Sequence, residues 1–150
     1  MMWRLFFLLM LSCGSVDKED SSASVGVLER QSISTEGNGF LTTLELSSDL
    51  FRMKIRNMTG QERILQYSPC EPRLEIFRKD GESVWSTDDI ACMAIIQTSH
   101  LAPGKELELI QKINAELVKE KGAYILKAEL KTDPSLPKPL IPKQMEFEIR

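Results

Sequence analysis

The sequence has no surplus of positive charge. Its 19 Lys and Arg residues are outnumbered by 22 Asp and Glu residues, so the formal net charge is -3. Proteins that bind nucleic acid cluster Lys and Arg to neutralise phosphates, often with aromatic residues interleaved. No such basic stripe is present, so we expect no nucleic-acid partner.

Residues that carry catalysis or hold metals are scarce. His100 is the only histidine, so any Ser-His-Asp or Cys-His arrangement would depend on it, and a turn is predicted directly after it. The three cysteines have no CxxC spacing, and there is neither an Asp/Asn-rich calcium loop nor a Gly-rich phosphate loop. We therefore predict a non-enzymatic protein with no metal and no cofactor.

Long hydrophobic runs are also missing, apart from residues 5–11. This run is too short to span a bilayer, and it follows Arg4 in the order typical of a secretory signal. The next residues, Met-Leu-Ser-Cys-Gly at 10–14, resemble the bacterial lipobox, in which a small residue precedes the lipid-modified cysteine. The resemblance implies a signal peptide at 1–12 and diacylglycerol, with acyl chains such as palmitate, on Cys13. The alternative is an incidental cysteine in an ordinary signal or N-terminal anchor.

Residues 13–39 are predicted to be the lipidated cysteine and a flexible tether. They are rich in Ser, Asp, Glu and Gly, a composition that buries too little apolar surface to order itself. A doubly acylated cysteine gives stable membrane anchoring. We therefore expect a lipid anchor at the cell envelope. The familiar sorting rule implies the outer membrane in a host with two membranes, because Gly14 rather than Asp follows the cysteine.

From residue 40 to residue 150, apolar and polar residues alternate in short runs separated by turn residues. A period of two predicts strands with one buried face. Asp80-Gly81 favours a hairpin, and Pro103-Gly104 favours a turn before a strand at 106–112. We therefore predict an all-β domain, an immunoglobulin-like antiparallel β-sandwich. Its clearest strands are expected at 44–46, 51–55, 74–76, 107–109, 124–130 and 145–149.

Cys70 and Cys92 remain once Cys13 is assigned to the lipid anchor. An even pair of cysteines in an exported domain is expected to form a disulfide, and the alternative is two free buried thiols. The bond would close a loop of about 23 residues and stabilise the fold by about 3 kcal/mol in the chain-entropy description.

The order of several segments resembles the intracellular proteinase inhibitor family, also called BsuPI. The resemblance covers residues 40–150 and is carried by the segments 51–57, 75–85, 101–105 and 122–124, the last ending in Tyr124. It implies an immunoglobulin-like sandwich and proteinase inhibition.

Residues in the matching segments also have physical roles that can be argued directly. Asn57 is predicted to cap the turn after its strand, and Gly81 to supply the positive φ of a hairpin. Trp85 is predicted to anchor the core between the sheets, and Pro103 with Gly104 to form a turn. All are scaffold residues, and no pattern marks a reactive loop.

Two functional hypotheses follow from the sequence. The first is a membrane-anchored, non-enzymatic binding module that engages another protein, such as a proteinase, through a sheet edge or a hairpin loop. The second is a structural or assembly lipoprotein of an envelope complex, with residues 133–142 as a contact. A catalytic role would have to depend on His100.

Overall fold

The computed structural model describes residues 30–89, 91–93, 95–114, 116, 120–132 and 137–150. The predicted signal, Cys13 and tether residues 13–29 lie outside this range. Within it the regular structure is one short 3-10 helix, η1 (Thr87–Asp89), and strands. The strands are β1 (Gln31–Gly37), β2 (Phe40–Ser47), β3 (Leu50–Asn57), β4 (Arg63–Tyr67), β5 (Arg73–Arg78), β6 (Ser83–Ser86), β7 (Gln97–Leu101), β8 (Glu106–Lys112), β9 (Gly122–Glu129) and β10 (Met145–Ile149).

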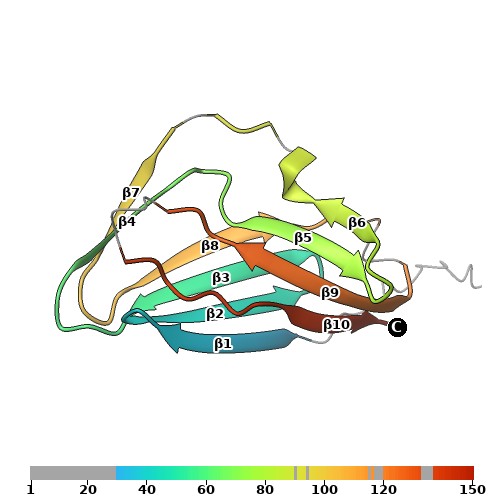
Figure 1. Ribbon diagram of the computed structural model, residues 1–150, viewed down its shortest axis with the longest axis horizontal. Coiled ribbons are helices and arrows are strands. Elements are labelled where there is room, and N and C mark those ends of the chain that lie inside the picture. Colours follow the sequence, from blue (N-terminus) through green and yellow to red (C-terminus); the bar gives the residue numbers. More distant parts are fainter. Residues whose placement is uncertain (1–29, 90, 94, 115, 117–119, 133–136) are drawn as a thin grey trace, which may run out of the picture.

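Two four-stranded antiparallel sheets face each other. One has the order β1-β2-β3-β8 and the other β10-β9-β5-β6, and Figure 1 shows them as two layers. β4 and β7 form a separate two-stranded ribbon at one end of the molecule. The predicted all-β antiparallel sandwich is confirmed.

The core lies between the two layers and follows from the alternation in the sequence. Every second side chain of a strand points to the same face, so the apolar positions of β2, β3, β9 and β10 meet in the interior. Tyr124 is buried there, and its ring stacks on that of Phe147 with centroids 5.4 Å apart. Fully enclosed side chains include Phe40, Leu44, Phe51, Met53, Ile76 and Leu126.

β1 corrects the predicted domain boundary. Residues 31–37 were expected to belong to the tether, but they pair with β2 along their whole length. Asn38 and Gly39 form the two-residue connection, with φ values of 56° and 84°. Asn-Gly is the preferred pair for this tight hairpin turn, which requires positive φ at both residues. Ladder hydrogen bonds, rather than burial, thus order a largely exposed polar segment, and the folded domain includes β1.

Most of the predicted scaffold residues lie as expected. Gly81 has φ of 95° in the β5–β6 hairpin, and Gly104 has φ of 75° in the turn before β8. The Lys105 amide donates to the Ala102 carbonyl at 3.0 Å, which closes the Pro103-Gly104 turn. Trp85, on the edge strand β6, is partly buried and packs against the core. It pairs with the fully buried Ile76, so its side chain lies on the inner face of its sheet, at the edge of the space between the two sheets.

Asn57 is fully buried and uses its whole hydrogen-bonding capacity. Its Nδ2 donates to the carbonyl of Gln61 at 2.7 Å and to that of Leu101 at 2.8 Å. Its Oδ1 accepts from the amide and the hydroxyl of Thr59, at 2.9 and 2.7 Å. The predicted capping role is confirmed. The side chain also joins the turn after β3 to the end of β7, which lies far along the chain.

Candidate functional site

The connection between η1 and β7 carries the most unusual surface of the described chain. In Figure 1 it runs from η1 along the upper side of the molecule to β7, outside the two layers of the sandwich. Met93, Ile95 and Ile96 expose 70%, 52% and 72% of their surface. We call Cys92, Met93, Ile95 and Ile96 the disulfide-anchored loop. Large apolar side chains grouped on one exposed segment are typical of interaction sites.

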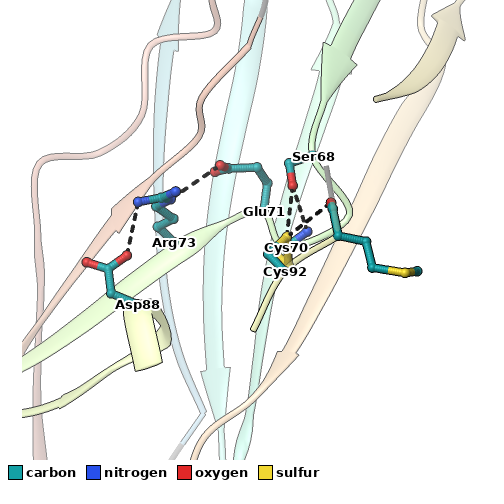
Figure 2. Close-up of a disulfide and its surroundings, with 7 residues drawn as sticks. Ser68, Cys70, Glu71, Arg73, Asp88 and Cys92 are labelled. Carbon is teal, nitrogen blue, oxygen red and sulfur yellow. Dashed lines mark hydrogen bonds and ion pairs between the residues drawn. A yellow bond between two sulfur atoms is a disulfide. The ribbon is translucent and has the colours of Figure 1, made fainter. Parts of the chain in front are cut away.

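A disulfide fixes the start of this loop. Cys92 is bonded to Cys70, with the Cα atoms 5.9 Å apart, which confirms the predicted pairing. Figure 2 shows Ser68 beside the bond. The Ser68 hydroxyl lies 3.2 Å from Cys92 Sγ and accepts from the Cys70 amide at 3.3 Å. Because a disulfide sulfur carries no hydrogen, Ser68 is the donor to it.

A second anchor fixes the other end of the loop. Gln97 begins β7 and pairs with Tyr67 at the end of β4. Tyr67 and Cys70 are three positions apart in the sequence, so both ends of residues 93–96 are attached to one short stretch of chain. The described residues between these two attachments leave their apolar side chains exposed rather than packed in the core.

A network of charged side chains lies next to the disulfide in the chain, beginning at Glu71. Glu71 is buried, and its carboxylate accepts from the Lys131 amide at 3.0 Å and lies 3.7 Å from Arg73 Nε. Arg73 also bonds Asp88 of η1 at 3.1 Å, as Figure 2 shows. Burial raises the pKa of Glu71, an effect that the Lys131 amide and the Arg73 charge offset only in part. This network links η1 to Glu71, the residue that follows Cys70.

The ribbon β4–β7 continues the exposed surface. Cross-strand partners share a face of a sheet, so Ile64 and His100 lie on the same side of the ribbon. Ile96 directly precedes this ribbon in the chain. His100 is exposed, and its Nδ1 lies 3.2 Å from Glu62 Oε1. His100 therefore belongs to the surface next to the loop.

This arrangement can bind a partner that offers an apolar cleft. Backbone restraint at both ends lowers the conformational entropy lost on binding, and the exposed side chains supply apolar area to bury. The amide of Ile95 further restrains the loop by donating to the Met93 carbonyl at 2.8 Å. No reactive-loop pattern is visible in the sequence, because the Ala-Cys-Met-Ala-Ile-Ile segment has the composition of a core strand.

Comparison with known families identifies the domain. Residues 44–135 match the family described as intracellular proteinase inhibitor, BsuPI. The chain belongs to this family. The BsuPI match covers the disulfide, the disulfide-anchored loop and the ribbon, whereas β1 and β10 lie outside it. No curated protein matches the chain.

Other expectations concern metals and membranes. The described residues contain no group of three or more His, Cys, Asp or Glu side chains placed to hold a metal ion. No helix in the described part of the chain is long and apolar enough to cross a membrane. Cys13, the predicted lipidation site, lies outside the described residues.

Proposed function

We propose that this BsuPI protein is an envelope-anchored proteinase inhibitor that binds its target with the disulfide-anchored loop. The observation that carries the proposal is the loop itself: apolar side chains exposed between a disulfide and a paired strand, within a domain of an inhibitor family. A proteinase cleft accepts an extended segment. A segment restrained at both ends enters it with little loss of entropy.

The test is inhibition of a panel of proteinases by the full-length chain, with variants that place charge on exposed apolar positions. Ile95→Asp introduces a carboxylate into the proposed contact. Ile110→Asp is a matched control, because Ile110 on β8 exposes the same 52% of its surface at a distant site. We expect Ile95→Asp to weaken inhibition about 100-fold, because it places a charge in an apolar contact that becomes buried on binding. Equal effects of the two variants, or no inhibition by the wild-type chain, would contradict the proposal.

We further propose that lipid on Cys13 holds the domain at the membrane. The sequence supports this through the short apolar run before a Ser-Cys-Gly segment. Intact mass spectrometry of the protein from the membrane fraction should show Cys13 as an acylated N-terminus. Cys13→Ala should remove the added mass and move the chain to the soluble fraction. An unlipidated chain that retains Met1 would refute the anchor while leaving the inhibitor proposal untouched.

A further inference from the structure

We infer that Met93 is the side chain that enters the specificity pocket of the target, and that the target is a proteinase with a deep apolar pocket. The inference rests on the proposed inhibitory function and names its substrate class. It separates Met93 from Ile95 and Ile96, which are also exposed.

Backbone restraint is concentrated around Met93. It directly follows Cys92, which is fixed by the disulfide, and its carbonyl accepts the Ile95 amide at 2.8 Å. The same carbonyl oxygen lies 3.7 Å from Cys92 Sγ. Met93 thus directly follows the covalent anchor, and its carbonyl takes part in a local turn of the loop, while 70% of its surface is exposed. This combination presents an exposed side chain beside a covalently restrained position.

The chemistry of the side chains favours Met93 over its neighbours. Met is unbranched and adapts to the shape of an apolar pocket, whereas isoleucine is stiff at χ1 because it is branched at Cβ. Ile96, although 72% exposed, directly precedes β7 and so lies next to the paired ribbon. We therefore assign Ile96 to the rim of the contact and Met93 to its centre.

The charge of the surroundings determines the class of pocket. The described residues of the segment 91–99 are all uncharged: Ala91, Cys92, Met93, Ile95, Ile96, Gln97, Thr98 and Ser99. A pocket with a buried carboxylate at its base, as in trypsin, would be left with an unpaired charge by Met93, which is strongly unfavourable. An apolar pocket, as in chymotrypsin, would be filled by it. The loop thus fits the second class.

The experiment is a change of selectivity, measured as inhibition constants of the full-length chain against chymotrypsin and trypsin. Wild type should inhibit chymotrypsin more strongly. Met93→Lys should weaken chymotrypsin inhibition about 100-fold or more and strengthen trypsin inhibition, because lysine matches the acidic pocket. Ile110→Lys is the matched control, since it adds the same charge at a distant exposed position.

Two results would overturn the inference and are distinguishable. If wild type inhibits but Met93→Lys alters the selectivity no more than Ile110→Lys does, Met93 is not the specificity residue, and the inhibitory function stands. If neither wild type nor any variant inhibits a proteinase, the proposed function fails and the assignment of Met93 fails with it. Circular dichroism on every variant establishes that the fold is intact, which the exposure of both positions leads us to expect.

Discussion

Replacement of Asn57 by alanine tests whether one buried amide holds the two turns together. The change removes four hydrogen bonds, two donated to the Gln61 and Leu101 carbonyls and two accepted from Thr59. Each such bond contributes about 1 kcal/mol net. The carbonyl of buried Leu101 loses the Asn57 amide as a partner, whereas the carbonyl of exposed Gln61 still accepts from the Thr59 hydroxyl. We expect Asn57→Ala to lower the free energy of unfolding by about 3 to 4 kcal/mol.

Thermal and urea unfolding followed by circular dichroism measure this loss. For a domain of this size about 1 kcal/mol corresponds to about 4 °C, so the midpoint should fall by about 12 to 16 °C. Asn114→Ala is the control, because exposed Asn114 accepts only the Glu116 amide in the described structure, and it should cost under about 1 kcal/mol. A loss at Asn57 no larger than that at Asn114 would refute the argument.

Asn57→Asp separates hydrogen bonding from shape. Aspartate keeps the size of the side chain and both bonds from Thr59, but as a carboxylate it cannot donate to Gln61 or Leu101. It places a buried negative charge against two carbonyl oxygens instead. We expect severe destabilisation at neutral pH that is partly recovered in acid, where the protonated carboxyl regains one donor. A pH-independent loss would show that the carbonyls are not the partners that matter.

Three further predictions concern the disulfide, a hairpin glycine and two carboxyl groups. The double variant Cys70→Ala/Cys92→Ala should lose about 3 kcal/mol in urea unfolding, and an unchanged urea midpoint would contradict the loop-closure argument. Gly39→Ala should cost about 1 to 3 kcal/mol, since φ is 84° and the added Cβ would lie 2.5 Å from Thr59 Cγ2. Gly60→Ala, which meets nothing within 4 Å, should be near neutral, and equal costs would refute the steric reasoning.

The carboxyl prediction compares Glu71→Gln with Glu45→Gln. Burial raises the pKa of Glu71 above its ordinary value of 4.5, so the native state holds the proton more tightly and this group's contribution to stability falls as pH rises through that region. Burial also acts to raise the pKa of Glu45, but bonds from Lys54 and Arg30 outweigh it and lower the pKa, so its contribution is lost as pH falls below 4.5. The difference in urea midpoint between wild type and Glu71→Gln, measured from about pH 3 to 8, should therefore change with pH in the opposite direction to the difference between wild type and Glu45→Gln. If both differences changed in the same direction, the environments assigned to the two carboxyl groups would be wrong.

The strands that could be predicted are those whose burial is one-sided. In β3 and β10, apolar residues occupy every second position, and the core requires them to face inward, so the pattern and the structure agree. β7, with the sequence Gln-Thr-Ser-His-Leu, has only one buried residue and no apolar alternation. Its strand conformation comes from pairing with β4, a long-range interaction that no local pattern records. The same holds for β1, although Asn38-Gly39 was a readable signal for its hairpin.

The candidate site could not be predicted, for a related reason. Hydrophobic residues at 93–96 suggest burial, and the sequence does not show that both ends of the segment attach near Tyr67 and Cys70. The disulfide pairing was predictable from the count of cysteines, but its consequence for the neighbouring residues was not. Only the register of β4 with β7, together with the disulfide, shows that Cys92 and Gln97 attach to the same short stretch of chain.

The way the loop is attached bears on what it can do. Most loops are fixed by burying some of their side chains, and those side chains are then unavailable to a partner. Here a covalent bond and one strand pairing supply the restraint, so Met93, Ile95 and Ile96 stay exposed. Their exposure means that they contribute little burial to folding, so the fold alone does not require apolar residues at these positions. A binding role does require them, because a restrained loop gains affinity from each apolar side chain it buries against a partner.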